Sequence, residues 1–361
     1  MKSIFLHHGY KPQSKLWQQF CEFAGSIISF ASSRQRRDNS NCKLQSQMTF
    51  RLCTLFLKLG SHYNNRGIAL ITVILIVSIL VAVAIELNRS TRAAIYDAAN
   101  LSDGIKLTYI AKSGFYGAEA LLANTNNNYI TLRDNWANTE TLSAQSPTLF
   151  ADGYFIVIVE DEAGKIPLNK LVNGNEYNHN PDIKEVLRQL LIQPEFGLDG
   201  IIINVIVDSI KDWIVAKKAP LDCIEELLMV KGMTRDIFYG TDKKPALAQF
   251  VTTDSDGVGA ININTAPKMV LRALSGGISA GTADQMDEYR RTESNYKYLS
   301  DPTWYIKVPG MTATIKPELI TVTSNYFKII SVGKMKNMQQ GLSGIVKKAG
   351  QSVQIIKWRQ D

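Results

Sequence analysis

The sequence predicts an α+β protein: a long N-terminal helix, transmembrane in its first half, and an antiparallel sheet interrupted by a large inserted helical domain. Three observations support this prediction. An apolar run from Ile68 to Ile85 begins the helix, strand-like segments cluster after residue 309, and capped helical patterns occupy residues 180–291. Because 45% of the residues are hydrophobic and 20% are charged, the composition is globular and excludes disorder and collagen.

The apolar run is long enough to cross a membrane. It holds 18 residues without a charge, Gly or Pro, which make about 27 Å of helix, close to the roughly 30 Å hydrocarbon core of a bilayer. The alternative is the apolar core of a signal peptide, but such cores run only about 7 to 15 residues. We therefore expect a membrane-spanning helix.

Positive charge is concentrated before this run. Residues 1–67 hold ten Lys and Arg against two acidic residues, whereas residues 68–361 hold 30 basic and 31 acidic residues. By the positive-inside rule, the N-terminus stays in the cytoplasm and the C-terminal part lies across the membrane. The balanced charge of that part disfavours nucleic-acid binding, which needs clustered Lys and Arg.

The part after the span offers little for catalysis. Its single cysteine is Cys223 and its single histidine is His179. We expect Cys223 to be a small buried apolar residue rather than a nucleophile. Triads and zinc sites built on several His or Cys side chains lack their second member, so we expect no enzyme, and a periplasmic hydrolase is disfavoured.

The helix is expected to continue beyond the apolar run. Residues 86–124 are Ala-rich, and small or apolar side chains recur at steps of three and four residues, the spacing of one helical stripe. The members of this stripe are Ala94, Ala98, Leu101, Ile105 and Tyr109. A helix from Ile68 to about Asn124 would be roughly 85 Å long, its first half in lipid and its second half on a folded head.

Capped helices and strands make up the rest. Asn180 and Pro181 form an N-cap and first-turn pair before an apolar helical stripe. Asp222 (with Glu225 three residues later), Thr265 and Ser279 are the predicted starts of three more helices. β-branched and aromatic runs predict strands at 153–159, 319–322, 326–332, 343–347 and 352–358.

A polar basic segment, Asn64-Asn65-Arg66-Gly67, stands directly before the apolar run. This arrangement resembles the type IV pilin and pseudopilin class, whose precursors are cut after a Gly by a prepilin peptidase and methylated on the new first residue. The resemblance implies cleavage between Gly67 and Ile68 and N-methylation of Ile68. A leader of 67 residues is long for this class, and Met48 is an alternative start that leaves 20 residues through Gly67.

Position five of the expected mature chain narrows the resemblance. Most members have Glu there, which pairs with the amine of a neighbouring subunit in lipid, where an unpaired charge is costly. This chain has Thr72. The large minor pseudopilin of type II secretion, the general secretion pathway protein K family, characteristically lacks that Glu, and a subunit without it tolerates having no subunit above it.

Further motifs are similar to that family in order and spacing. They are Asp161–Asn169, in which Pro167 replaces the first Asn of a D-E-x-G-K-I-N-L-N pattern, Lys211–Ile214, Pro220–Thr234 and Ile261–Pro267. The resemblance covers about Arg66 to Asp361 and implies a pilin-like head with an inserted helical domain. The implied parts are a leader (1–67), a transmembrane and N-terminal helix (68–92), the first part of the head (93–175), the inserted domain (176–310) and C-terminal strands completing the head (311–361).

Residues 262–290 look like a helix-hairpin-helix unit, and residues 227–233 suggest part of a second. Such hairpins often bind the DNA backbone, which gives the alternative function of a membrane-anchored DNA-capture protein of a competence system. The connecting turn 275–282 has no basic residue, however, and acidic Asp284 and Asp287 follow it. We therefore expect a structural hairpin and no nucleic-acid partner.

Acidic residues supply candidate calcium ligands. Asp208 and Asp212 are four residues apart on one predicted helix, and Asp254 and Asp256 lie in a fragment that resembles a calcium loop. Calcium takes six to eight oxygens, and an EF-hand loop starting at Thr252 would lack its first Asp and last Glu. Family K members are associated with calcium, often through an acidic stretch after the D-W-I motif, where this chain has residues 215–218, Val-Ala-Lys-Lys. We expect no cofactor, with a hairpin turn at 256–257 and with capping or solvated aspartates; calcium at the four named residues is the alternative.

The resemblance implies a non-catalytic minor pseudopilin that initiates or caps the pseudopilus. Its expected partners are minor pseudopilins I and J, the inner-membrane secretion platform and the prepilin peptidase. Its expected location is the inner membrane, with a single span, a cytoplasmic N-terminus and a periplasmic C-terminal domain.

Overall fold

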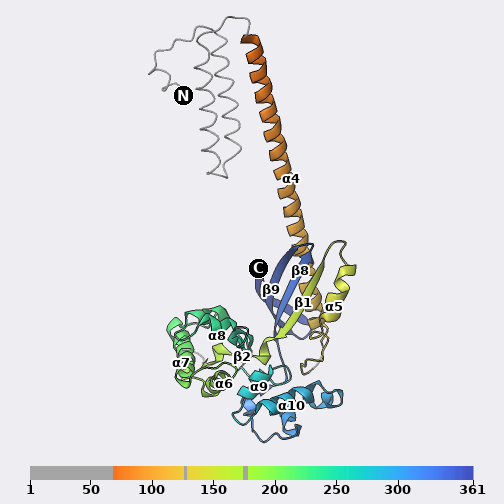
Figure 1. The fold of residues 1–361 in the computed structure, drawn as a ribbon. Helices are drawn as coiled ribbons and strands as arrows, with labels where there is room; N and C mark the ends of the chain where they lie inside the picture. The colour runs from red at the N-terminus through yellow and green to blue at the C-terminus, as the bar shows by residue number, and fades with distance from the viewer. Residues whose placement is uncertain (1–67, 126–127, 174–177, 258, 361) are drawn as a thin grey trace. The chain divides into compact units, whose positions relative to one another are not determined.

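The computed structural model describes residues 68–125, 128–173, 178–257 and 259–360. The helix α4, Ile68–Ala123, is a single element of 56 residues (Figure 1). The predicted long helix is therefore confirmed, and it ends one residue before the expected position. The chain divides into two compact units, residues 1–94 and 95–361.

Within the first unit, the described residues are the apolar half of α4. This half is long and apolar enough to cross a membrane, and its large aliphatic side chains from Leu70 to Leu87 are exposed. Exposed aliphatic side chains along a whole helix are costly in water but are stable in lipid. The helix therefore fits a single-pass membrane anchor.

The second unit contains a four-stranded antiparallel sheet in the order β1-β8-β9-β10. The strands are β1 Tyr154–Asp161, β8 Tyr326–Met335, β9 Met338–Ala349 and β10 Ser352–Gln360. They confirm four predicted strands, and each extends beyond its predicted end. Because β1 pairs with β8, the chain leaves the sheet after β1 and returns to it only after the helical part.

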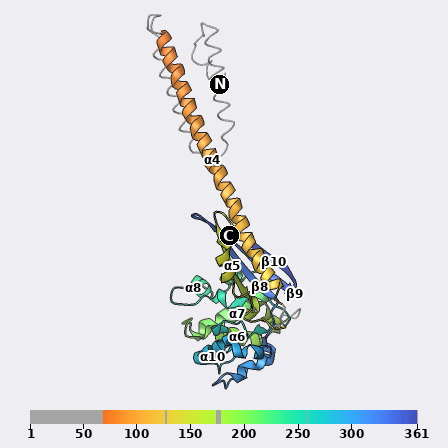
Figure 2. The same cartoon turned by 90° about the vertical axis from the view of Figure 1, so that its right-hand side faces the viewer.

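The end of α4 packs on one face of this sheet (Figure 2). Its buried side chains are Leu107, Ala111, Phe115, Ala118 and Leu122. This is a different face from the predicted stripe, whose members in the second unit, Ala98, Leu101, Ile105 and Tyr109, are exposed. The close approach needs glycine, because a Cβ on Gly333 of β8 would lie 2.7 Å from the Leu107 carbonyl oxygen.

Between β1 and β8 lie the helices and short strands. The helices are α6 Pro181–Leu191, α7 Gly200–Lys217, α8 Arg235–Tyr239, α9 Lys268–Ala273 and α10 Ala280–Arg291; α5, Glu140–Gln145, precedes β1. Short strand pairs are β2 Ile166–Pro167 with β5 Val251–Thr252, β3 Val172–Asn173 with β4 Asn178–His179, and β6 Ile261–Asn262 with β7 Ile320–Thr321. The 3₁₀ turns are Ser146–Thr148, Glu162–Gly164, Leu168–Lys170, Ile224–Met229 (η5), Leu247–Gln249, Glu293–Tyr298, Pro302–Lys307 (η8) and Pro317–Leu319.

Two predicted helix starts are confirmed and two are wrong. The Asn180 side chain accepts the N–H groups of the first turn of α6, and Ser279 caps α10. By contrast, α9 begins after Pro267 and Thr265 caps nothing. The segment after Asp222 is a 3₁₀ helix, Ile224–Met229, whose N-cap residue is Cys223 and which has no side-chain cap hydrogen bond.

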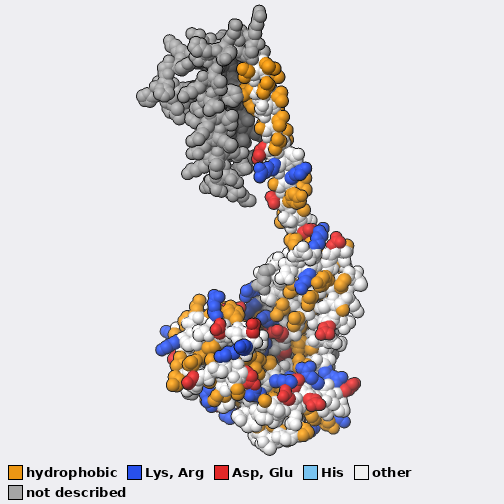
Figure 3. Space-filling view, in the orientation of Figure 1, with side chains coloured by type: hydrophobic (Ala, Val, Ile, Leu, Met, Phe, Trp, Pro, Cys, Tyr) orange, Lys and Arg blue, Asp and Glu red, His pale blue; other side chains and the backbone are white. Residues whose placement is uncertain are grey.

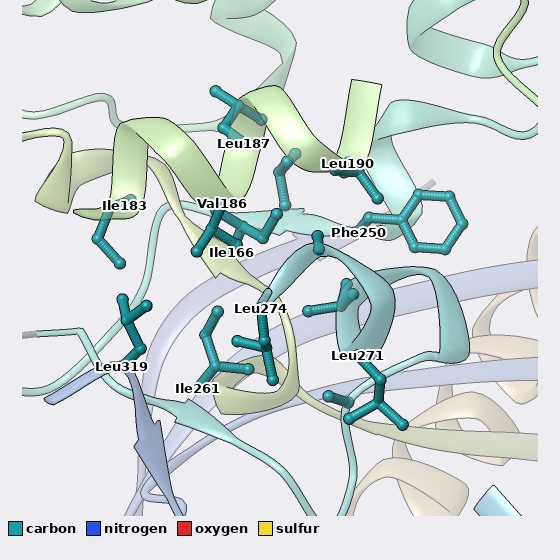
Figure 4. Close-up of a cluster of buried hydrophobic side chains, with 14 of the residues drawn as sticks. Ile166, Ile183, Val186, Leu187, Leu190, Phe250, Ile261, Leu271, Leu274 and Leu319 are labelled. Atoms are coloured by element: carbon teal, nitrogen blue, oxygen red, sulfur yellow. The ribbon is translucent and has the colours of Figure 1, made fainter. Parts of the chain in front are cut away.

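The helical part has its own core, which Figure 4 shows. The predicted stripe of α6 is buried here, and α9 contributes Leu271 with the following Leu274. Ile261 and Leu319 come from segments on either side of α10 and meet the same core. This core holds together residues that lie between β1 and β8 in the chain.

Candidate functional site

The expected processing site lies at the edge of the described residues. Gly67 falls outside them, and Ile68 is the first residue of α4. Thr72 lies one helical turn later, on the exposed apolar half of the helix. The position that is usually Glu is therefore a neutral side chain within a segment suited to lipid.

Beyond the membrane segment, α4 has two apolar faces. One is buried under the sheet, as described above. The other carries Leu101, Ile105, Tyr109 and Tyr116, which are 67%, 51%, 66% and 52% exposed. We call these four residues the outer stripe. A helix at the surface of a globular domain normally has one apolar face, so the outer stripe is an exposed apolar surface of the kind that marks an interaction site.

The four candidate calcium ligands are not gathered in one place. On α7, Asp208 pairs with Lys184 at 2.7 Å and Asp212 pairs with Lys211 at 3.2 Å. Asp254 pairs with Lys357 at 2.8 Å, and Asp256 pairs with Lys347 at 3.4 Å. Within the described residues, no group of three His, Cys, Asp or Glu side chains could hold a metal ion.

The prediction of a β-hairpin with its turn at 256–257 is wrong, because the strands on either side of this turn do not pair with each other. Asp256 and Gly257 do form a turn, in which the Gly259 N–H donates to the Asp256 carbonyl at 2.9 Å. The flanking strands β5 and β6 do not pair with each other, because β5 pairs with β2 and β6 with β7.

A lysine ammonium fills the oxygen cluster that follows α7. Lys217 Nζ donates to the Pro220 carbonyl at 3.0 Å, to Asp222 Oδ2 at 2.8 Å and to both Glu226 carboxylate oxygens at 2.9 and 3.0 Å. These hydrogen bonds, first to Asp222 and then to Glu226, raise the pKa of Lys217. A main-chain carbonyl and two carboxylates are the ligand types that calcium prefers, and here they surround the chain's own cation.

A second ammonium connects the sheet to the helical part. Lys357 of β10 donates to the Asp222 carbonyl at 2.8 Å and to Asp254 Oδ2 at 2.9 Å. It also lies 3.3 Å from Thr253 Oγ1. Asp222 thus lies between two lysines, one on α7 and one on β10.

Asp161, at the end of β1, is buried and accepts four hydrogen bonds. Asp161 Oδ2 accepts from Ser324 Oγ at 2.5 Å, Thr265 Oγ1 at 2.6 Å and Asn262 Nδ2 at 3.1 Å, and Oδ1 accepts from the Ala163 N–H at 2.9 Å. Burial raises its pKa to about 6, against the opposing effect of these donors. Because the partners come from three separate segments, Asp161 connects the sheet, the segment before α9 and the return to β8.

The prediction that Cys223 is buried is wrong. It is exposed rather than buried, because it precedes η5 at the rim of a hollow of about 260 Å³ whose lining includes Asp222, Lys357 and Trp358. Although the residue as a whole is exposed, partial desolvation of its sulfur, together with the nearby charge of Glu225, raises the pKa of the thiol and so lowers the population of the thiolate. Neither the Asp161 network nor the two lysine clusters were predicted, since each depends on residues far apart in the sequence.

Comparison with known proteins points to one fold. No family model matches the sequence, and no curated protein matches it. A chain in the crystal structure of the GspK-GspI-GspJ complex, from the type 2 secretion system of enterotoxigenic Escherichia coli, matches with a TM-score of 0.51 and 15% sequence identity. The match covers 73% of this chain and 99% of that chain. By this match, the chain has the fold of a GspK-like minor pseudopilin.

Proposed function

We propose that this protein is a non-catalytic minor pseudopilin of a type II secretion system that initiates or caps the pseudopilus. The observation that carries the proposal is the outer stripe of α4. A membrane anchor needs apolar side chains only within lipid, yet the second unit has its own exposed apolar side chains on α4, at Leu101, Ile105, Tyr109 and Tyr116. Such a helix is suited to pack against the helices of neighbouring subunits.

The partners follow from the same proposal. The matched structure is a GspK-GspI-GspJ complex, which supports minor pseudopilins I and J as neighbours of this chain. Its place at the end of the assembly is supported by Thr72, because a subunit with no neighbour above it has no amine to neutralise. The proposal also includes processing by the prepilin peptidase, contact with the inner-membrane platform, and a periplasmic C-terminal part.

The alternative of DNA capture has less support. The basic side chains near the segment between α9 and α10 are engaged by carboxylates: Lys268 with Asp284 at 2.7 Å, and Arg290 and Arg291 with Asp287 at 2.6 and 2.9 Å. Phosphate binding would require these ion pairs to break. The described hairpin region therefore lacks a free basic surface.

The test is co-purification of the full-length chain with minor pseudopilins I and J from the same host. The variant Leu101→Lys/Ile105→Lys places two charges in the outer stripe, and we expect it to abolish co-purification and secretion. Ile306→Lys on η8 is the matched control, because Ile306 is 64% exposed and lies outside α4. Normal secretion and co-purification with the outer-stripe variant would contradict the proposal.

A further inference from the structure

On the side of the sheet that faces away from α4, the strand β1 is apolar. Along β1, Phe155 and Val157 are buried in the core beneath the sheet. The alternate side chains Tyr154, Ile156 and Ile158 point to the opposite side and are 40%, 38% and 50% exposed. An antiparallel sheet with one solvated face normally carries polar side chains on that face, whereas β1 is apolar on both.

The register extends this surface onto β8. Ile156 is opposite Val332 and Ile158 is opposite Ile330, and directly opposed side chains on one face are in contact distance. We call Tyr154, Ile156, Ile158, Ile330 and Val332 the sheet patch. Figure 3 shows hydrophobic side chains together with Lys or Arg side chains over this part of the molecule. The patch is therefore one continuous surface rather than scattered exposed residues.

A hollow lies at one end of the sheet patch. It has a volume of about 240 Å³, and its lining includes the apolar Tyr154, Pro147, Phe150 and Met335, the basic Lys334 and Lys336, and the acidic Asp152. Lys336 is paired with Asp103 at 3.4 Å, which leaves Lys334 as the basic group that faces Asp152. Apolar walls beside basic groups suit an apolar side chain with a carboxylate next to it. Such a side chain would anchor a partner that lies along the patch.

The edge of the sheet next to the patch is closed to another strand. Thr139 Oγ1 donates to the Val157 carbonyl at 2.6 Å, and Ser143 Oγ accepts the Val157 N–H at 3.1 Å. Ser146 Oγ accepts the Phe155 N–H at 3.1 Å and donates to the Phe155 carbonyl at 3.0 Å. A partner cannot extend the sheet at β1 by strand addition, so it must lie on the face.

Lysines lie at both ends of the patch, together with the acidic Glu160 and Asp152. Lys334 is opposite Tyr154 at one end, and Lys328 is opposite Glu160 at the other. Glu160 is held by Lys165 at 2.7 Å, which lowers the pKa of Glu160 although burial raises it. Because Glu160 is paired within the chain, two copies that met through the patch would each present Lys328 and Lys334, and this likeness of charge disfavours a second copy as the partner.

We infer that the sheet patch is a docking surface for the head of a neighbouring, non-identical pseudopilin whose apolar side chains are flanked by Asp or Glu. This inference rests on the proposed function. It adds a second contact on the side of the sheet opposite α4. Neighbouring subunits would then contact this chain at two separate surfaces, the outer stripe of α4 and the sheet patch.

The test uses the full-length chain, co-expressed with tagged minor pseudopilins I and J and extracted in mild detergent. Ile158→Lys introduces a charge into the patch, and Lys334→Glu reverses its charge without touching the core. Ile306→Lys and Lys243→Glu are the matched controls on exposed positions elsewhere. We expect about a tenfold or larger loss of recovered complex for each patch variant and no loss for the controls.

The outcomes separate this inference from the proposed function. Wild-type recovery by both patch variants, together with loss in Leu101→Lys/Ile105→Lys, would overturn the docking surface and leave the pseudopilin assignment standing. Failure of the wild-type chain to co-purify at all would contradict the proposed function itself. Self-association that the patch variants abolish would show that the partner is a second copy. If Ile158→Lys lowers the melting temperature, its loss of complex could come from unfolding. The recovery of complex with Lys334→Glu then decides whether the sheet patch is a docking surface.

Discussion

Thr265 Oγ1 donates a hydrogen bond of 2.6 Å to Asp161 Oδ2, although the two residues are 104 positions apart. With Ser324 and Asn262, this contact fixes the end of β1 to the segment that leads into α9. All the side-chain donors are neutral, so the buried carboxylate has no opposite charge beside it. We call this set of hydrogen bonds the Asp161 joint. Its geometry is specific, but ionisation of the buried Asp161 carboxyl within it costs free energy.

The first prediction is that the Asp161 joint makes stability depend on pH. Its folded pKa of about 6 is above the value of about 3.9 for an unfolded chain. The unfolded chain thus loses this proton more readily, and the free energy of unfolding falls as pH rises from about 4 to about 6, by about 3 kcal/mol in total. Thermal unfolding of the full-length chain and of Asp161→Asn, each in detergent, should show this slope only in the wild type.

The control for this measurement is Asp152→Asn, since Asp152 is exposed and next to the same strand. It should keep the wild-type slope. Asp161→Ala should be less stable than Asp161→Asn by about 2 kcal/mol or more, because it leaves buried donors without an acceptor. Equal pH slopes in the wild type and Asp161→Asn would mean that Asp161 does not titrate in this range.

The second prediction concerns the packing of α4 on the sheet. Gly333→Ala would bring a Cβ within 2.7 Å of the Leu107 carbonyl oxygen and 3.0 Å of the Ala111 nitrogen, and backbone cannot yield as a side chain can. We expect a loss of about 1–3 kcal/mol in the free energy of unfolding. The control is Gly104→Ala in α4, where an added Cβ meets nothing within 4 Å. This change should be neutral or should stabilise the protein by about 1 kcal/mol. Equal effects of the two changes would refute the close contact.

The third prediction is about calcium. Since Lys217 occupies the oxygen cluster formed by Asp222 and Glu226, millimolar calcium should change the melting temperature of the full-length chain by less than about 1 °C. A site filled at 100 times its dissociation constant would add about 2.7 kcal/mol and raise the melting temperature by several degrees. Lys217→Gln should lower the melting temperature, whereas the exposed Lys231→Gln should not. A calcium-dependent rise in the wild type would contradict this prediction.

Local signals predicted local structure well. The Asn180 cap and the buried stripe of α6 could be read from the sequence because each involves neighbouring residues. Thr265 was misassigned as a helix cap, since a hydroxyl before an apolar run looks the same whether it bonds its own backbone or a distant Asp161. The stripe of α4 was identified correctly as apolar, but periodicity cannot say which apolar face the sheet covers when the helix has two. Cys223 is exposed because tertiary contacts, rather than its own chemistry, set its position.

The fourth prediction concerns Thr72 and the place of this subunit in the assembly. If the chain sits at the end, position five has no amine to neutralise, and Thr72→Ala should leave secretion nearly unchanged because a local hydrogen bond is worth about 1 kcal/mol. Thr72→Glu should reduce secretion, since an unpaired carboxylate in hydrocarbon costs several kcal/mol. Loss of secretion with Ala and normal secretion with Glu would place the subunit inside the fibre.

Processing of the N-terminus can be examined through Gly67. Gly67→Val should block cleavage, because the peptidase must approach the backbone closely before the cut, and the precursor should accumulate in membranes. The same experiment tests the start at Met48. Peptides from residues 1–47 in the expressed precursor would show that translation begins upstream of it.

The identity of the mature N-terminus tests the pseudopilin assignment most directly. Mass spectrometry of the protein purified from membranes that contain the prepilin peptidase should find a chain that begins with N-methylated Ile68. Cells without the peptidase should yield only the longer, unmethylated form. A mature chain that begins at any other residue, or one that begins at Ile68 without needing the peptidase, would contradict the assignment.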